Sequence, residues 1–312
     1  ANPVDTYLSG KSEATKRMVK SHMNKVAVLF DYEDYQHTPW GSIQYEHLQT
    51  LIGVLQQQKH AHTTINAIIS AVRGTVRAAM GMKLMTADDY QRLMLVKMVS
   101  GVRLPTGRMM TQGEIKALVD ACLNDYLKVK DDNTPVKQSP AAYRDLAILG
   151  LMYIGGLRRS EVADLNVEDI DLELKEARII GKGNKERMLF LDEGTVIAVK
   201  QWLELRGDFD GALFYRVLKN GKIQAGRLSD QAIYNVVKKR QKEAGITEIS
   251  PHDFRKTFIS TILEETGDLR MAQALAGHSD PKTTANYDRR EIKEMRKAAG
   301  TLHFPLMSND DE

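Results

Sequence analysis

The 312-residue sequence has few of the features that mark several specialised classes of protein. It contains a single cysteine, Cys122, which excludes a disulfide framework, and its helical spacing from Leu118 predicts a small buried side chain. No apolar run approaches the roughly eighteen residues of a membrane-spanning helix. The amino-terminal residues lack the apolar core of a signal peptide, so we expect a cytoplasmic protein with no membrane partner.

The composition is that of an ordinary globular protein, with 42% hydrophobic and 27% charged residues, and the length suffices for two domains. The net charge is only +3, but it is unevenly distributed. Residues 1–108 carry 13 basic and 8 acidic side chains, whereas the remaining residues carry 31 and 33. A basic amino-terminal portion suits contact with a polyanion, although a solvated basic face explains the same pattern equally well.

Apolar residues recur at helical spacing in four stretches of the first hundred residues, and no strand pattern interrupts them. These stretches are 12–35, 43–58, 63–80 and 86–99. Thr63 and Thr64 are expected to cap the third helix, and Thr86 with Asp89 forms a capping pattern for the fourth. We therefore predict an all-α domain over residues 1–103, followed by a linker at 104–110, within the glycine- and proline-containing stretch GVRLPTGRMM.

Beyond the linker, helical patterns continue but a short β-hairpin joins them. Thr111 and Glu114 form a capping box, and a long apolar helix from residue 141 ends at the pair Gly155-Gly156. Residues 177–180 and 187–191 are β-prone and flank the turn GKGNKE. Ser160 is expected to cap a short helix and Asp253 a longer one. The fold class is mainly α with a small β-hairpin or sheet, with a second domain at 111–290 and a tail at 291–312.

Six side chains near predicted helix or hairpin boundaries supply an anion site and a hydroxyl. They are Arg158, Lys182, His252, Arg255, His278 and Tyr287. Guanidinium groups match the non-bridging oxygens of a phosphodiester, and the phenol of a tyrosine can attack phosphorus once nearby cations assist it. This inventory suits the cleavage of a phosphodiester without a metal.

The residue types also suggest separate roles in such a reaction. Arg158 and Arg255 would bind the charge that develops on the phosphate. Lys182, at the hairpin tip, would donate a proton to the leaving 5′-oxygen. His252 would accept the proton of the attacking phenol of Tyr287, and His278 would hydrogen-bond a non-bridging oxygen.

Further basic side chains are candidates for contacts with nucleic acid, although a solvated face is the commoner explanation of such patterns. Two of them lie four residues apart on one predicted helix, two belong to the hairpin, and three lie in the stretch VKKRQK. They are Arg73, Arg77, Lys185, Arg187, Lys238, Lys239 and Arg240.

Four motifs together resemble the tyrosine recombinases, also called phage integrases. They are GGLRRSEVADL, IIGKGNKERMLFL, SPHDFRKTFIST and LAGHSDPKTTANY, and their order and spacing are similar to those of the Xer and integron branch. The resemblance is specific over residues 111–290. It implies that Glu161 supports Arg158 rather than taking part in the chemistry.

The resemblance also implies a two-domain C-shaped clamp on duplex DNA, in which the amino-terminal unit is a core-binding domain. The implied activity is site-specific recombination through a 3′-phosphotyrosine intermediate and a Holliday junction, with no metal or nucleotide cofactor. The implied partners are DNA carrying a recombination site and further copies of the chain in a homo-tetramer, with accessory proteins left open. The tail at 291–312 is expected to dock on a neighbouring protomer or to fold back on its own, and the expected location becomes cytoplasmic and nucleoid-associated.

Three alternatives remain at this point. A type IB topoisomerase would use the same cleavage chemistry without exchanging partners. An architectural DNA-binding protein would keep the fold without catalysis. A hydrolytic metal site built from His252, Asp253, His278 and Asp280 is disfavoured, because the pattern offers no further carboxylate at ligand spacing.

Overall fold

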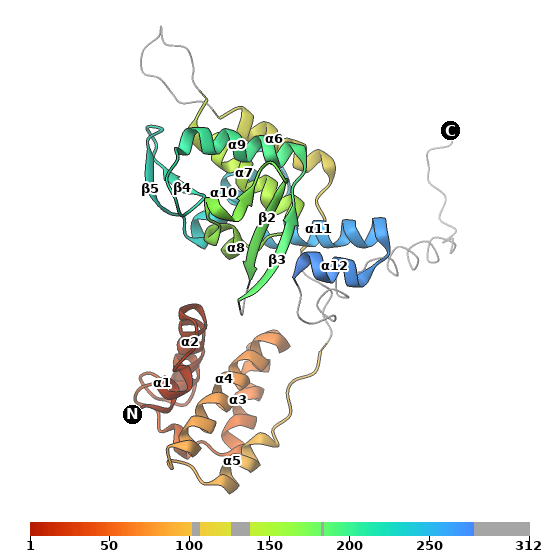
Figure 1. Ribbon diagram of the computed structural model, residues 1–312. Coiled ribbons are helices and arrows are strands. Elements are labelled where there is room, and N and C mark those ends of the chain that lie inside the picture. Colours follow the sequence, from red (N-terminus) through yellow and green to blue (C-terminus); the bar gives the residue numbers. More distant parts are fainter. Residues whose placement is uncertain (102–106, 126–137, 182–183, 278–312) are drawn as a thin grey trace, which may run out of the picture. The chain divides into compact units, whose positions relative to one another are not determined.

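The computed structural model describes residues 1–101, 107–125, 138–181 and 184–277. The chain divides into two compact units, Ala1–Leu104 and Pro105–Glu312, each with its own hydrophobic core (Figure 1). Among the described residues, none of the helices combines the length and the apolar character that crossing a membrane requires.

All the regular secondary-structure elements of the first unit, over its described residues, are helices. Its helices are α1 (Pro3–Leu8), α2 (Glu13–Leu29), the short 3-10 helix η1 (Trp40–Ser42), α3 (Tyr45–Gln57), α4 (His62–Gly81) and α5 (Ala87–Met94). The other elements all pack against α4, whose apolar side chains are buried on more than one side. Helix α4 is therefore the centre of this unit's core.

The predicted all-α character of this unit is confirmed, but the prediction needs four corrections. Helix α2 ends at Leu29 and not at residue 35. Helix α1 was not expected, because its six residues are too few to show a period. Helix α4 begins after Ala61, so the expected threonine cap is wrong. Helix α5 ends at Met94 and not at residue 99. The cap of α5 is as predicted, because the Thr86 hydroxyl accepts a hydrogen bond from the backbone N–H of Asp89 at 3.1 Å.

The second unit is also mostly helical and contains two small antiparallel sheets. Its helices are α6 (Gln112–Leu123), α7 (Pro140–Gly155), α8 (Arg159–Asp164), the 3-10 helix η2 (Val167–Asp169), α9 (Glu193–Arg206), α10 (Asp230–Glu243), α11 (Pro251–Thr266) and α12 (Leu269–Ala276). Its strands are β1 (Ile170–Asp171), β2 (Glu176–Gly181), β3 (Lys185–Phe190), β4 (Tyr215–Val217) and β5 (Ile223–Arg227).

Strands β1, β2 and β3 form one sheet in that order, and β4 pairs with β5 in the other. The predicted hairpin is confirmed: β2 and β3 pair from Glu176 with Phe190 to Gly181 with Lys185. The second sheet was not predicted, since its strands are short and β5 is mostly exposed. The fold class predicted from the sequence is thus correct, with one more sheet than expected.

Helix α7 is the centre of this unit and packs against α6, α8, α9, α10, α11 and β3. Its burial on most sides explains why its sequence is apolar almost throughout. Cys122 from α6 lies in the same core, with no exposed surface, and burial raises the pKa of its thiol to about 12. The prediction of a buried cysteine is confirmed.

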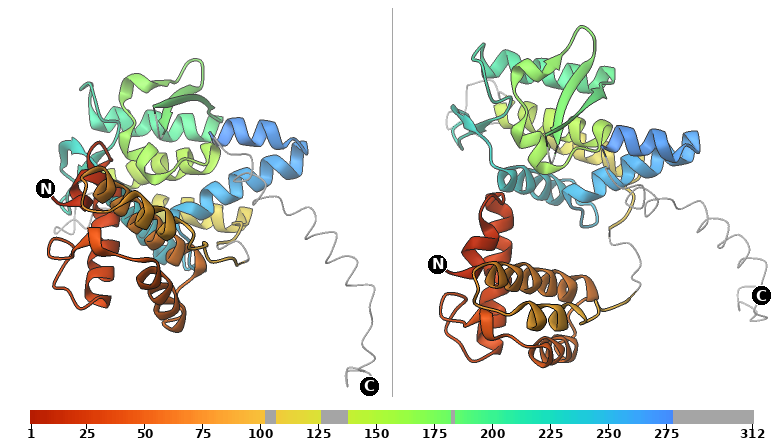
Figure 2. Two further views of the ribbon diagram at one scale, coloured as in Figure 1. Left: turned by 90° about the horizontal axis from the view of Figure 1, so that it is seen from below. Right: turned by 60° about the horizontal axis from the view of Figure 1, so that its bottom comes forward.

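Three helix ends bring chemically important side chains to one region. Helix α7 ends at Gly155 and is capped by Gly156, whose φ of 54° is left-handed, and the chain turns directly into α8. Helices α11 and α12 lie side by side, as Figures 1 and 2 show. The end of α12 approaches β3, which places the hairpin beside the beginning of α8.

Candidate active site

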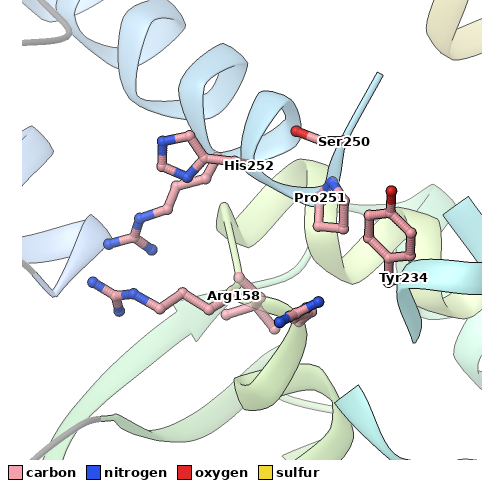
Figure 3. Close-up of a pocket in the computed structure, with 8 residues that line it drawn as sticks. Arg158, Tyr234, Ser250, Pro251 and His252 are labelled. Carbon is pink, nitrogen blue, oxygen red and sulfur yellow. The ribbon is translucent and has the colours of Figure 1, made fainter. Parts of the chain in front are cut away.

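An open pocket of about 280 Å³ lies between the beginning of α8, helix α10 and the beginning of α11. Its lining residues are Leu157, Arg158, Arg159, Tyr234, Ser250, Pro251, His252 and Arg255. Figure 3 shows Arg158 and His252 on facing sides of this pocket, with Tyr234 and Pro251 to one side. Three arginines and a histidine around one opening make it a site for an anion.

Arg158 occupies the N-cap position of α8, where the sequence suggested Ser160. Glu161 completes the cap: its Oε2 accepts the backbone N–H of Arg158 at 3.0 Å, and its Oε1 accepts Nη1 of the same residue at 2.6 Å. The Arg158 side chain remains 41% exposed, so its guanidinium is oriented by Glu161 and still reaches the pocket. Arg158 is therefore both the N-cap of α8 and one of the cationic groups that line the pocket.

Glu161 also receives Arg187 from β3. The Nη2 of Arg187 lies 2.9 Å from Oε2 of Glu161, and its Nε donates to the carbonyl of Leu275 in α12 at 3.1 Å. Burial acts to raise the pKa of Glu161, but the hydrogen bonds and charge of Arg187, with those from Arg158, outweigh it and lower that pKa. Glu161 is thus an anionic bridge between α8 and the hairpin.

Arg255, on α11, is only 2% exposed. Its Nη1 donates to the carbonyl of Gly156 at 2.8 Å, and its Nη2 donates to the carbonyl of Ala276. One guanidinium therefore joins the end of α7 to the end of α12. Together with Arg187, it fixes the last turn of α12, which precedes His278 in the chain.

His252 lies one turn before Arg255 on α11, and it keeps an exposed surface in the pocket. The protein around its ring removes part of the hydration that an imidazolium needs, and the charge of Arg255 opposes protonation further. Both effects lower the pKa of His252 below its ordinary value. A neutral imidazole in this position can accept a proton.

We predict that His252 titrates below pH 6.5, the ordinary value for histidine. The folded state disfavours the charged ring, so the unfolded state takes up a proton first, and stability falls as the pH drops from 6.5 through the lowered pKa. NMR titration of the histidine rings, with His252→Gln to identify the signal, measures this pKa. A midpoint at or above 6.5 contradicts the prediction.

Comparison with known proteins assigns the family. The model of the phage integrase family matches residues 108–294. The chain is 30% identical to the tyrosine recombinase XerC of Alcanivorax borkumensis, over 88% of this chain and 84% of the relative. It is 31% identical to the XerC of Pseudomonas putida, over 95% of this chain and 93% of the relative. The chain belongs to the phage integrase family of tyrosine recombinases. It is a site-specific DNA recombinase.

Solved structures agree on the fold of this recombinase. The Tn1549 transposon integrase in complex with transposon right end DNA has a TM-score of 0.63 and 15% identity, and the match covers 96% of this chain and 100% of the integrase chain. A lambda integrase dimer bound to a COC′ core site has a TM-score of 0.63 and 14% identity, covering 99% and 98% of the two chains. At these identities the likeness concerns the fold alone.

The structure brings three of the six predicted catalytic residues of the recombinase, Arg158, His252 and Arg255, to one pocket. The other three, Lys182, His278 and Tyr287, lie outside the described residues. For Lys182 and His278, the residue that precedes each of them in the chain is described. Lys182 directly follows β2 in the hairpin that Arg187 secures, and His278 directly follows Gly277, the C-cap of α12.

The two candidate DNA contacts of the first unit differ in their surroundings. The Nη2 of Arg73 donates to the carbonyls of Met94 and Val96, so this side chain joins α4 to the residues around the end of α5. Arg77 is exposed, and its Nε donates to the hydroxyl of Tyr90 at 2.9 Å. Arg73 therefore serves the fold of its unit, whereas a contact between Arg77 and DNA stays a prediction.

The candidate DNA contacts of the second unit fall into two groups. Arg240 has no exposed surface and is paired with acidic side chains, so the prediction that it contacts DNA is wrong. Arg187 is mostly buried and pairs with Glu161, so it serves the framework behind the pocket. Lys185 is exposed, and Lys238 and Lys239 are held in ion pairs at the surface. For these three lysines, contact with DNA stays a prediction.

Sequence reasoning did not single out every residue of the pocket. Arg159 lines it beside Arg158 and is paired with Asp230 at 3.3 Å, and its position next to a candidate residue was a usable signal. Tyr234 also lines it, but nothing in the helical pattern of residues 230–243 marks it. Its position follows only from the packing of α10 against α8.

Asp253, one of the four residues considered for a metal site, instead takes part in the cap of α11. Asp253 was expected to cap α11, but the N-cap is Ser250, and Asp253 at the third position accepts the backbone N–H of Ser250 at 2.8 Å. The described part of the chain contains no group of three or more His, Cys, Asp or Glu residues able to hold a metal ion. His278 and Asp280 lie outside that part.

Proposed function

We propose that this recombinase cuts DNA by attack of the Tyr287 hydroxyl on a phosphodiester held in the pocket of Arg158, His252 and Arg255. The bond from phosphorus to the 5′-oxygen breaks, a 3′-phosphotyrosyl bond forms, and the 5′-hydroxyl is released. The observation that carries this proposal is the convergence of Arg158, His252 and Arg255 from two separated motifs, GGLRRSEVADL and SPHDFRKTFIST, on one pocket.

The surroundings of each group support a distinct role. The guanidiniums of Arg158 and Arg255 bind the non-bridging oxygens, on which charge grows as phosphorus becomes five-coordinate. The low pKa of His252 leaves its ring neutral and able to accept the phenolic proton. Lys182 gives a proton to the departing 5′-oxygen, and His278 hydrogen-bonds the phosphate.

The reverse reaction rejoins the strand, because the phosphotyrosyl bond retains the energy of the phosphodiester. Two such rounds of cutting and rejoining, separated by a Holliday junction, exchange the strands of two duplexes. This sequence of steps consumes no nucleotide cofactor.

The partners follow from the same chemistry. Exchange between two duplexes needs four active sites, so the recombinase acts as a homo-tetramer on two copies of a specific DNA site. Residues 1–103 form the core-binding unit, residues 104–110 connect it to the catalytic unit at 111–290, and both units bind the duplex. The tail at 291–312 docks on a neighbouring protomer. The relatives whose structures contain DNA, such as the Tn1549 integrase, support DNA as the partner.

Covalent capture tests the proposed chemistry. The recombinase first selects its sites from a pool of random-sequence duplexes. The selected sites are then rebuilt with a nick close to the cleavage position, so that the short fragment carrying the released 5′-hydroxyl diffuses away and the strand cannot be rejoined. In EDTA, we expect the wild type to form a covalent adduct, and digestion with mass spectrometry should locate the DNA on the peptide that contains Tyr287. Tyr287→Phe should bind the same duplex without forming the adduct. An adduct on the peptide of Tyr234, or one that needs added metal, contradicts the mechanism.

A further inference from the structure

The segment that follows the junction between the two units is fastened to the beginning of α11. The backbone N–H of Arg108 donates to Oδ1 of Asp253 at 2.8 Å, and the Nζ of Lys256 donates to the carbonyl of Gly107 at 2.8 Å. The backbone N–H of Met110 donates to the hydroxyl of Thr257 at 2.9 Å. Three hydrogen bonds within four residues of chain thus hold residues 107–110 along the first two turns of the helix.

The space between Gly107 and Asp253 is too small for a side chain at position 107. Its φ of +84° is in the left-handed region, and a Cβ built on it would lie 2.4 Å from Oδ1 of Asp253. The same oxygen accepts the N–H of Arg108, so it cannot move away without breaking that hydrogen bond. A glycine at position 107 is therefore a requirement of this contact.

The two charged side chains of this contact are buried, and this opposes the separation of residues 107–110 from α11. Lys256 is 1% exposed and Asp253 is 5% exposed. Asp253 also accepts the backbone N–H and the hydroxyl of Ser250, both at 2.8 Å, which completes the cap of α11. Buried polar groups are stable only while their partners stay in place, so a shift of residues 107–110 disturbs the cap as well.

The same two turns of α11 carry two residues of the pocket. Asp253, Lys256 and Thr257 are three and four residues apart and share one face, whereas His252 and Arg255 share the neighbouring face. A displacement of this helix end therefore moves His252 and Arg255 together. Misplacing reacting groups by about 1 Å can slow an enzyme roughly a hundredfold.

We propose that Asp253 and Lys256 are positioning residues of the recombinase: by clamping residues 107–110, they fix the end of α11 and with it His252 and Arg255. This inference rests on the catalytic roles proposed above for those two residues. The clamped segment begins three residues after Leu104, where the first unit ends. The described segment that follows this boundary is thus joined to the helix that carries two groups of the pocket.

Paired variants test the role of this clamp. Gly107→Ala adds a methyl group against Asp253, and Lys256→Met removes the ammonium while keeping the length of the side chain. Lys256→Arg restores a cation and serves as the rescue. Gly113→Ala is the matched control, because a Cβ at that helical position meets only the Thr111 hydroxyl oxygen, at 3.8 Å.

Two measurements on the full chain separate the clamp from the proposed chemistry. Adduct formation by pre-bound protein on the selected nicked duplexes reports catalysis, and we expect Gly107→Ala and Lys256→Met to slow it about 10- to 100-fold. NMR titration of His252 reports its environment without DNA, and we expect its pKa to return toward 6.5 in both variants. DNA affinity should stay within about twofold of the wild type, since the clamp lies beside the pocket and not in it.

The outcomes are distinct. Lys256→Arg should recover most of the rate, and Gly113→Ala should match the wild type in both measurements. An unchanged His252 titration together with an unchanged adduct rate overturns the positioning role, even if thermal unfolding shows a loss of stability. A shifted titration with an unchanged rate leaves the clamp in place and instead contradicts the catalytic role of His252.

Discussion

Replacing Arg255 by lysine is expected to slow DNA cleavage roughly a hundred- to a thousandfold, the range found for removing one preorganised donor to an oxyanion. Noncovalent binding of the selected duplex should change little, because most of the affinity of such proteins comes from many phosphate contacts along the DNA. The charge is kept in this variant. What is lost is the planar fork of the guanidinium.

The geometry explains why an ammonium cannot replace that fork. Arg255 donates to the carbonyl of Gly156 with one nitrogen and to that of Ala276 with another, so its plane is fixed by two helix ends. A lysine donates from a single nitrogen and cannot reach both carbonyls and a phosphate in the same plane. The last turn of α12 loses one of its two arginine contacts as a result.

Adduct formation in a single turnover, with the protein in excess over a nicked duplex, measures the effect. The matched control is Arg206→Lys. Arg206 is also buried, at 4% exposure, and donates to the backbone carbonyls of Ala212 and Gly207, but it lies outside the pocket. Arg206→Lys should lower the thermal stability and keep the cleavage rate. Equal rates for Arg255→Lys and the wild type would remove Arg255 from the mechanism.

Local signals in the sequence predicted much of the framework around this site. The capping boxes at Thr111 and the glycines at Gly155-Gly156 act within a few residues of themselves, so their outcomes could be read from the chain. The β2–β3 hairpin is equally local, because its turn residues and its alternation determine the pairing. The motifs around Arg158 and Arg255 identified residues that the fold brings together.

Contacts between residues distant in sequence could not be predicted in this way. Nothing in the spacing of Glu161 and Arg187 shows that they pair, since 26 residues separate them. The N-caps of α8 and α11 were misassigned because Ser160 and Asp253 are good cap residues by type, whereas the true caps depend on where the preceding turn ends. The clamp of Lys256 on Gly107 spans 149 residues and has no local signal.

The basic stretch at 238–242 shows the same limit in its strongest form. Four cations in five residues resemble a surface patch, yet Arg240 has no exposed surface while Lys239 beside it is 46% exposed. Helix geometry turns neighbouring residues about 100° apart, so one faced the core and the other the solvent. Arg240 is the cation that faces the core, where it pairs with Asp145 of helix α7. That partner cannot be identified from the basic stretch alone.

Arg240 holds together three helices of the second unit. Its Nε donates to Asp145 at 2.8 Å, its Nη2 lies 2.6 Å from Asp125, and its Nη1 lies 2.9 Å from Glu243. Asp145, on α7, has no exposed surface either and is also paired with Arg144 at 2.7 Å. Burial acts to lower the pKa of Arg240, but the charges of Asp145 and Asp125 raise it above its ordinary value. Arg240 therefore remains charged and continues to require its acidic partners.

Arg240→Met is accordingly expected to destabilise the second unit by about 3–5 kcal/mol, because removing one partner leaves Asp145 charged and buried with less compensation. Lys239→Met removes the adjacent cation, which also pairs with Asp125, but its exposure limits the loss to about 1 kcal/mol or less. Urea unfolding followed by the fluorescence of Trp202, in a Trp40→Phe background, confines the measurement to this unit, since these are the only two tryptophans. Equal unfolding midpoints for Arg240→Met and Lys239→Met would show that the buried pairing contributes nothing beyond a surface ion pair. If Arg240→Met instead kept its stability and lost affinity for DNA, the assignment of Arg240 to the core would be wrong.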